Sequence, residues 1–442
     1  MTELEIGAWL FVITFVVLFS GIPIAFGLTA VAIGFLAIFG DPGALQAVAK
    51  TFIGELSNFA LLTLPMFVVL GAAIGMSRAG RDLYESLHRW LCRLPGGLVI
   101  ANIFGCGLFS AMCGSSPATA AAIGKVGIPE MLKRGVPARL ATGAIAAGGT
   151  LGILIPPSIT FIIYGIVTHT SIARLFLAGV IPGLALILLF AVYAWFASRS
   201  GLKRAIAARQ APPPETYTLA EKLSGLLRTL PFLGIIVAVT VFMYGGFATP
   251  SEVAAIAAFL ALVLVAVVYR SLRLKDLWAI MRDATRESSM ILLIIAAAAL
   301  YAYMMSYLYV TQSVADWMFG WQLSHWQLIL VLNLFLLLAG FFMPAVSVIL
   351  MSMPIMLPVL QQSEIDLVWF AVMLTINLEI GLIHPPLGLN LFVIRGVAPQ
   401  VPLREVMWGS LPFVMIMLLF IVLLAIFPAI ATWLPDLLMG PA

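Results

Sequence analysis

Charged residues are scarce in this chain of 442 residues: Asp, Glu, Lys and Arg make up 10% of it, whereas 63% of it is hydrophobic. A soluble domain carries about 25% charged residues, so the composition excludes a soluble globular protein. It predicts an integral membrane protein with many helical spans in a lipid bilayer. Short cytoplasmic loops of membrane proteins collect Lys and Arg. We therefore attribute the net charge of +4 to such loops and expect no nucleic-acid partner.

Cysteine and histidine are also scarce, with three and four residues respectively. Cys92, Cys106 and Cys113 are too few for a disulfide framework or a metal site and are expected to be small buried hydrophobes. The chain has no zinc signature, Walker motif or nucleophile elbow. These absences disfavour an enzyme and ATP hydrolysis within the chain. The lack of a ring-forming filter motif disfavours a channel.

What the chain does have is a pair of matching interruptions in hydrophobic segments, GILIPP at 152–157 and GLIHPP at 381–386. A double proline removes two backbone donors and stops a helix. Such a break is tolerated at membrane depth only where the freed carbonyls line a cavity or bind something. Its presence in both halves predicts a transporter built from internal repeats, with its site at the breaks.

A third interruption, Gly114-Ser115-Ser116-Pro117, divides the hydrophobic stretch 98–129 into arms too short to span a bilayer. Basic residues precede and follow this stretch, so both of its ends are expected on the cytoplasmic side. We therefore predict a re-entrant helical hairpin with its tip at Gly114–Pro117. A broken helix at about 140–169 follows it.

The same order recurs about 229 positions later, with a second hairpin at about 327–360 and a second broken helix at about 367–394. The loop after the second hairpin, 361–366, has no Lys or Arg and suits the outer side, so the two hairpins enter from opposite sides. The predicted organisation is a first inverted repeat (1–210), a proline-rich linker (211–220) and a second inverted repeat (221–442).

The remaining segments complete a prediction of ten crossings and two hairpins. The first hydrophobic run is expected to form two helices, 5–20 and 23–38, and the last helix is expected at about 411–434. Four connecting segments mix charge with large apolar residues and favour interfacial amphipathic helices, with plain loops as the alternative. They are 41–57, 78–95, 270–286 and 311–326.

The first hairpin tip carries the chemistry expected of a cation and anion site. Hydroxyls of Ser115 and Ser116, with the free carbonyls that end the first arm, are hard uncharged oxygen ligands appropriate to Na⁺. The exposed amides of the second arm favour an anion such as a carboxylate. The break around Gly149, Thr150 and Gly152 is expected to bring more carbonyls to the same place. An ordinary serine cap is the alternative reading.

The second site has fewer hydroxyls: its tip offers Pro344 and Ser347, and its break offers His384, Gly388 and Asn390. His384 is an intramembrane ionisable residue and so a functional candidate, or a neutral ring that donates to a backbone carbonyl. Glu379 is either a proton carrier or a structural hydrogen-bonding group. Asn390 either caps the helix after the break or contacts substrate.

The stretches 108–124, 148–158 and 381–392 closely resemble the large membrane subunit of tripartite ATP-independent periplasmic (TRAP) transporters. The resemblance covers essentially the whole chain. It implies an all-α, inverted-repeat, elevator-type secondary transporter in the bacterial inner membrane, driven by a Na⁺ gradient. It also implies a small four-helix membrane subunit and a periplasmic substrate-binding protein as partners, with an organic anion, mostly a carboxylate, as substrate.

By position, the resemblance implies one sodium site at Ser115, Ser116 and the 149–152 backbone, and another at the second tip and the 381–386 break. Many members have an acidic residue, Pro and a small hydroxyl residue at the second tip, where this chain has Met343-Pro344-Ala345. The alternative is a proton-coupled carboxylate carrier or exporter of the same fold that acts without a binding protein. The candidate binding residues are Gly114, Ser115, Ser116, Gly149, Thr150, Gly152, Pro156, Pro157, Pro344, Ala345, Ser347, Gly381, His384, Pro385, Pro386 and Asn390, with Glu379 and His384 as possible proton carriers.

Overall fold

The computed structural model describes residues 1–440 apart from 42, 208–216, 271 and 386. Every regular element among these residues is helical, which confirms the predicted all-α class. By length and composition, nine helical stretches of the described chain could cross a membrane. Both arms of the second hairpin are among the nine, since each has 18 residues.

The helices before residue 208 are α1 (Glu3–Phe19), α2 (Ile24–Phe39), α3 (Ala47–Leu56), α4 (Thr63–Met76), α5 (Ala79–Leu91), α6 (Gly97–Cys113), α7 (Ser116–Lys133), α8 (Ala138–Leu154), α9 (Ile159–Thr168) and α10 (Ile172–Ala207). Those after residue 216 are α11 (Leu219–Tyr244), α12 (Pro250–Val263), α13 (Leu274–Tyr307), α14 (Val310–Gly320), α15 (His325–Phe342), α16 (Ala345–Gln362), α17 (Leu367–Ile383), α18 (Leu389–Val397), α19 (Leu403–Ile426) and α20 (Ala429–Met439).

The bounds of two helix pairs differ by 229 at both ends: Ser116–Lys133 with Ala345–Gln362, and Ala138–Leu154 with Leu367–Ile383. These are the second hairpin arms and the first parts of the broken helices. The helices thus follow the offset seen in the sequence. The division into two inverted halves stays a prediction, and most of the predicted linker lies outside the described residues.

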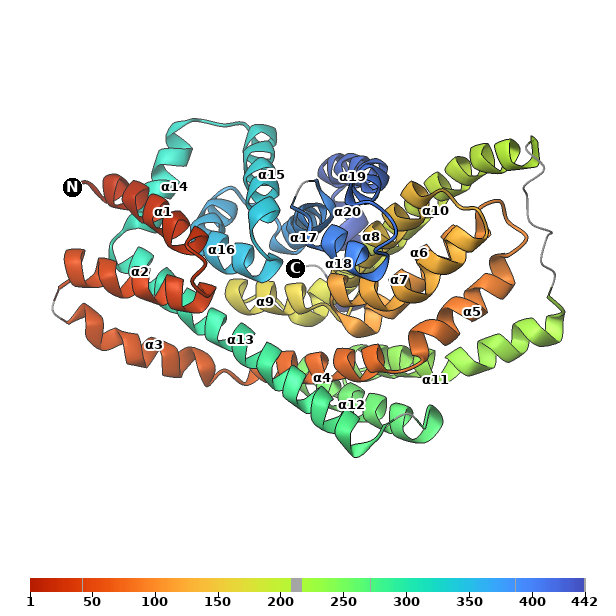
Figure 1. Ribbon diagram of the computed structural model, residues 1–442. Coiled ribbons are helices and arrows are strands. Elements are labelled where there is room, and N and C mark those ends of the chain that lie inside the picture. Colours follow the sequence, from red (N-terminus) through yellow and green to blue (C-terminus); the bar gives the residue numbers. More distant parts are fainter. Residues whose placement is uncertain (42, 208–216, 271, 386, 441–442) are drawn as a thin grey trace.

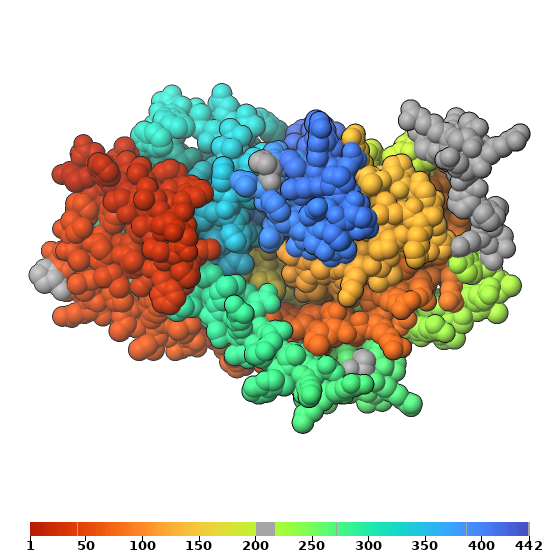
Figure 2. Space-filling view, viewed as in Figure 1, coloured from red at the N-terminus to blue at the C-terminus, as the bar shows by residue number. Residues whose placement is uncertain are grey.

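The hairpins and broken helices form one body, and α3, α4, α5, α11, α12 and α13 extend along its lower edge (Figure 1). Figure 2 shows the lower edge of the same view covered by the orange and green segments to which most of these helices belong. In the same view, the long helix α13 runs diagonally past α4 and α9. Helices α4 and α5 both pack against α6. The first hairpin therefore lies directly on the outer layer of helices.

Two close helix crossings hold the central body together. A Cβ atom at Gly143 on α8 would overlap the carbonyl oxygen of Gly409 on α19, and one at Gly381 on α17 would overlap that of Gly340 on α15. Glycine is the residue that permits backbones to approach this closely. Close packing of small residues is how helices associate in lipid, where the hydrophobic effect does not drive them together.

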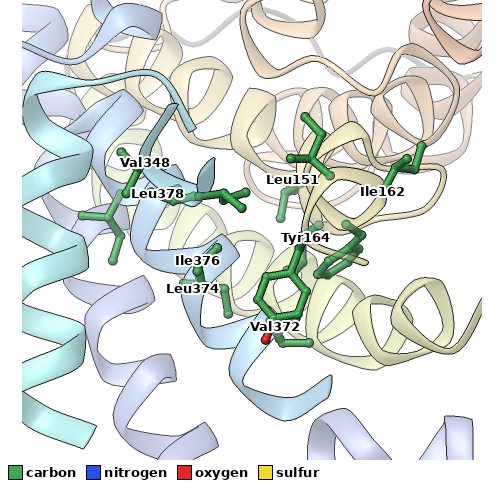
Figure 3. Close-up of a cluster of buried hydrophobic side chains, with 14 of the residues drawn as sticks. Leu151, Ile162, Tyr164, Val348, Val372, Leu374, Ile376 and Leu378 are labelled. Carbon is green, nitrogen blue, oxygen red and sulfur yellow. The ribbon is translucent and has the colours of Figure 1, made fainter. Parts of the chain in front are cut away.

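The core of the body is an apolar cluster shared by the two breaks. Leu151 on α8, Ile162 and Tyr164 on α9, and Val372 on α17 are all buried, and Figure 3 shows these side chains converging. The Tyr164 hydroxyl donates to the carbonyl oxygen of Leu367 at 2.8 Å, so its one polar atom is satisfied. Helices of both halves are thus locked into one unit.

Several predicted boundaries are confirmed and two are wrong. Helices α1 and α2 occupy the two predicted N-terminal segments, and α3, α5 and α14 lie within three of the four predicted connecting helices. The fourth segment, 270–286, is not a separate element, because α13 runs unbroken from Leu274 to Tyr307. The helix predicted at 411–434 begins at Leu403 and ends at Ile426, and α20 follows it.

Candidate functional site

The first hairpin turns at Gly114, whose φ of +61° is the left-handed conformation that glycine adopts without strain. Ser115 is the extended N-cap residue of α7, and Pro117 lies in the first turn, where its missing N–H costs nothing. The Ser115 side chain makes no cap hydrogen bond. The alternative reading, an ordinary serine cap, is therefore not what this side chain does.

The second serine of the tip contacts a carboxylate from the other half of the chain. The Ser116 hydroxyl donates to both carboxylate oxygens of Glu379, at 3.1 and 2.9 Å. Both side chains are buried, with 0% of Ser116 and 1% of Glu379 exposed. A buried carboxylate needs such donors or a cation, because leaving it without a partner is costly.

The first break packs against this tip as predicted. A Cβ at Gly149 would lie 3.0 Å from the Ser116 carbonyl oxygen, and one at Gly152 would lie 3.5 Å from the Thr119 hydroxyl. That hydroxyl is buried, and its polar neighbour in the part of the chain that is described is the Cys113 thiol. The Thr150 hydroxyl instead donates to the Ala147 carbonyl of its own helix at 2.6 Å, so this residue offers only backbone to the site.

The double proline of the first break also reaches the tip. Helix α8 ends at Leu154, before Pro156 and Pro157, and α9 begins only at Ile159. A Cβ at Gly114 would lie 3.4 Å from the Pro157 carbonyl oxygen. Tip and break therefore share one small region in which several oxygen atoms converge.

The second tip and break are also adjacent, but they meet through apolar contacts. The His384 ring stacks on Phe341 of α15 with centroids 4.2 Å apart. Pro344 caps α16, Ala345 begins it, and Pro385 follows His384; Pro386 lies outside the described residues. The buried Ser347 hydroxyl has no partner among the residues described, and it is the one hydroxyl at this tip.

Asn390 makes a second link between the halves. Its side-chain amide donates to the Ala146 carbonyl oxygen of α8 at 3.2 Å, and its own side-chain oxygen is buried with no partner in the described chain. Gly388 is the N-cap residue of α18 and no side chain caps that helix. Of the two predicted roles, the capping role is therefore wrong.

The sequence placed Glu379 with the second site, whereas the structure places it at the first. At an offset of 229, Glu379 corresponds to Thr150 of the first break and Ser116 corresponds to Ala345 of the second tip. The contact across the halves is thus present at the first tip, and the offset by itself does not reveal it.

A cavity of about 410 Å³ lies beside the first tip, between α7, α4 and α13. Ser115 lines it, as do Lys125 of α7 and Glu287 of α13. A smaller cavity of about 40 Å³ lies beside the second hairpin, between α1, α13, α15 and α16, and is lined mainly by apolar residues such as Phe335 and Met351. Ser115 and Ser116 therefore face different surroundings, the first an open cavity and the second a buried carboxylate.

Comparison with known proteins gives concordant results. The sequence profile described as "Tripartite ATP-independent periplasmic transporter, DctM component" matches residues 11–430. The C4-dicarboxylate TRAP transporter large permease protein DctM of Pseudomonas aeruginosa is 35% identical over 396 residues, which cover 90% of this chain and 91% of that protein. The isethionate TRAP transporter permease protein DctMQ of Oleidesulfovibrio alaskensis is 32% identical over 411 residues, covering 93% and 63%.

The fold is also similar to a solved structure. The YdaH transporter of Alcanivorax borkumensis superimposes with a TM-score of 0.63 at 17% sequence identity, covering 88% of this chain and 89% of that one. At this identity the likeness concerns the fold alone.

Proposed function

The chain belongs to the DctM component family of the tripartite ATP-independent periplasmic transporters, and on this premise we propose that it imports an organic anion, a carboxylate, by coupling to a Na⁺ gradient. It is a multi-pass protein of the bacterial inner membrane, as are the large permeases of this family. In the proposed mechanism, the two hairpins and two broken helices move as one body against the outer helices. The locked core around Tyr164 supports that rigid-body motion.

One observation carries the sodium assignment: the buried contact between Ser116 and Glu379. A monovalent cation in a protein interior needs oxygen ligands and a balancing negative charge. Such a set is available beside the Gly149–Gly152 backbone, from the Ser116 hydroxyl, the Glu379 carboxylate and the buried Thr119 hydroxyl. On cation binding, the Ser116 proton turns away and its oxygen, with that of Glu379, faces the ion.

A second sodium site is proposed at the second tip and the 381–386 break. The unpartnered hydroxyl of Ser347 supports it. No carboxylate contacts this tip in the described contacts, so the second site relies on neutral oxygens. We therefore expect the second site to bind its cation more weakly than the first.

Two partners are proposed: a small four-helix membrane subunit and a periplasmic substrate-binding protein. The name DctMQ of one relative, and the part of that protein which this chain does not cover, support the small subunit as a separate chain here. The family description, a tripartite periplasmic transporter, supports the binding protein. The two relatives named above take different anions, a dicarboxylate and isethionate.

A proton-coupled carrier of the same fold is the second candidate. The full burial of Glu379 favours it, since a buried carboxylate can bind a proton in place of a cation. His384 is the other candidate proton carrier, although its stacking on Phe341 gives the ring a packing role. The two candidates differ in which gradient drives uptake.

The test is uptake into proteoliposomes that contain the chain, its small subunit and the binding protein loaded with a carboxylate. We expect uptake to need both an inward sodium gradient and the binding protein. Uptake should be lost in Ser115→Ala with Ser116→Ala. It should persist in Ser352→Ala, whose hydroxyl donates to the Val348 carbonyl of its own helix. Uptake that ignores sodium and follows a proton gradient would overturn the sodium assignment and favour Glu379 and His384.

A further inference from the structure

One wall of the cavity beside the first hairpin is a face of α7 that carries mostly small side chains. Ser115, Ala118, Ala122 and Lys125 all line it, and their spacing of three or four residues puts them on one face of the helix. Small side chains on that face leave space, and the first charge along it is Lys125. The opposite wall, on α4, is built from equally small residues, including Gly71 and Gly75.

The two walls meet at the hairpin tip. A Cβ at Gly71 would lie 2.5 Å from the Cys113 carbonyl oxygen, so α4 touches the chain immediately before the turn. The cavity is therefore narrow beside Ser115 and extends from there along α7 to Lys125. In the predicted topology, that direction leads from the ion site towards the cytoplasm.

Two opposite charges face this space from different helices. Lys125 stands on the hairpin and Glu287 on α13. Neither side chain has a hydrogen-bond or ion-pair partner recorded in the described chain. In a protein with so few charges, the cavity thus presents an ammonium donor on one wall and a carboxylate acceptor on the other, and both are available to a solute.

We propose that this cavity binds the transported anion and favours one that carries a hydroxyl or amino group over one that carries a second carboxylate. The inference rests on the proposed transport function and adds a substrate class to it. The carboxylate of the solute lies at Lys125, and its donor group points to Glu287. A second carboxylate placed near Glu287 is repelled, because like charges facing each other across a site are unfavourable.

The test uses three solutes with the same four-carbon length: 4-aminobutanoate, 4-hydroxybutanoate and succinate. Binding of each to the full chain in lipid nanodiscs is measured by isothermal titration calorimetry at constant sodium. We expect both substituted monocarboxylates to bind the wild type about fivefold more tightly than succinate. Glu287→Gln should remove that difference in affinity, and Lys125→Gln should weaken the binding of all three solutes.

Lys133→Gln is the matched control for the lysine, because it lies on the same helix but does not line the cavity. It should leave all three affinities unchanged. The melting temperature of each variant checks that the fold is intact. Tighter binding of succinate by the wild type, no response to Glu287→Gln, or no binding of any of the three solutes would each overturn the inference.

Failure of this inference differs from failure of the proposed function. Sodium-driven uptake that continues unchanged in Lys125→Gln and Glu287→Gln would refute the charge-selective cavity and leave the transporter assignment intact. Charge-selective binding in a chain that transports nothing along a sodium gradient would refute the proposed function and leave the charge-selective cavity intact.

Discussion

The two hairpins lie at matching positions of the sequence, yet among the described residues only the first has a charged partner at its tip. Ser116 at the first tip contacts Glu379, whereas the corresponding pair at the second is Ala345 with Thr150. The first hairpin borders a large cavity with two charges, and the second borders a small apolar space. The first hairpin thus has polar and charged surroundings, whereas the second hairpin is surrounded mainly by apolar side chains.

The difference teaches that helices whose bounds match at an offset of 229 can place tip and break alike without determining which side chains stand there. Gly152 and Gly381 correspond to each other, and each lets a broken helix approach the first arm of its own hairpin. Positions 116 and 345 also correspond, but a methyl group has replaced the hydroxyl at the second. A close helix approach is thus found at both glycines, whereas the side-chain chemistry at the two tips differs.

Removing the charge of Glu379 should have the largest effect on this comparison. Glu379→Gln keeps an oxygen that Ser116 can donate to but deletes the negative charge, so we expect sodium-driven uptake to fall about 100-fold. Thr150→Val, the matching change in the other half, should lower sodium-driven uptake by about threefold or less, because the Thr150 hydroxyl bonds only its own helix. Initial rates of uptake in proteoliposomes measure both. Normal sodium-driven uptake by Glu379→Gln would contradict a charge-balancing role.

Alanine substitutions at the two matched glycines should lower the stability of the protein by different amounts. Gly381→Ala places a methyl group against the backbone oxygen of Gly340, which cannot move away, so we expect a loss of about 2 kcal/mol. Gly152→Ala meets the Ser110 side chain at 2.7 Å and should cost about 1 kcal/mol. Thermal unfolding in detergent should show the lower melting temperature for Gly381→Ala. The reverse order would mean that α15 and α17 can separate at this crossing.

Ser116→Ala tests the hydroxyl alone. Loss of one hydrogen bond to a charged group should lower the apparent sodium affinity about tenfold, read from uptake rates across a series of sodium concentrations. The reciprocal variant Ala345→Ser adds a hydroxyl at the second tip, where no carboxylate awaits it. Its sodium affinity should stay within about twofold of the wild type. A gain in affinity there would erase the distinction between the tips.

His384→Phe should have the smallest effect. The new ring keeps the stacking on Phe341, so uptake and melting temperature should both stay near wild-type values. His384→Ala removes the stack and should cost about 1 kcal/mol of stability. Abolished transport in His384→Phe, together with a normal melting temperature, would show that the imidazole carries a proton and that the second break is chemically active.

The sequence predicted the local breaks well because their causes are local. Gly114 needs a left-handed turn and the double prolines cannot continue a helix, so the tip and both interruptions lie where expected. The tip also meets the 149–152 backbone, as predicted. The contact between Ser116 and Glu379 was missed because hydropathy and breaks carry no information on which elements pack across the two halves.

The wrong boundaries have the same kind of cause. Charges such as Arg282 and Asp283 suggested a separate surface helix before α13, but no Gly or Pro interrupts Leu274–Tyr307, and both charged side chains are exposed. In the first half, the equivalent helices α3 and α4 are separated where Asn58 accepts a hydrogen bond from the Ala60 amide. A helix continues through polar residues unless something ends it.

The start of α19 was misplaced because Arg404 and Glu405 precede the uncharged hydrophobic stretch that predicted a helix at 411–434. Glu405 is in fact in the first turn of the helix, and both of its oxygens accept from Arg139 of α8, at 2.7 and 3.0 Å. Pairing with a distant helix thus permits charge at a helix end. The sequence around residue 405 alone does not reveal that pairing.

The hydrogen bond between Ser116 and Glu379 can form only late in the synthesis of the chain, because its partners are 263 positions apart. At about 5 to 20 residues per second, a ribosome needs roughly 13 to 50 seconds to add that length of chain. During this interval the first hairpin is already synthesised while the helix that carries its carboxylate partner does not yet exist. The proposed ion site is therefore completed only near the end of synthesis, and in a nascent chain arrested before α17 the Ser116 hydroxyl lacks this partner.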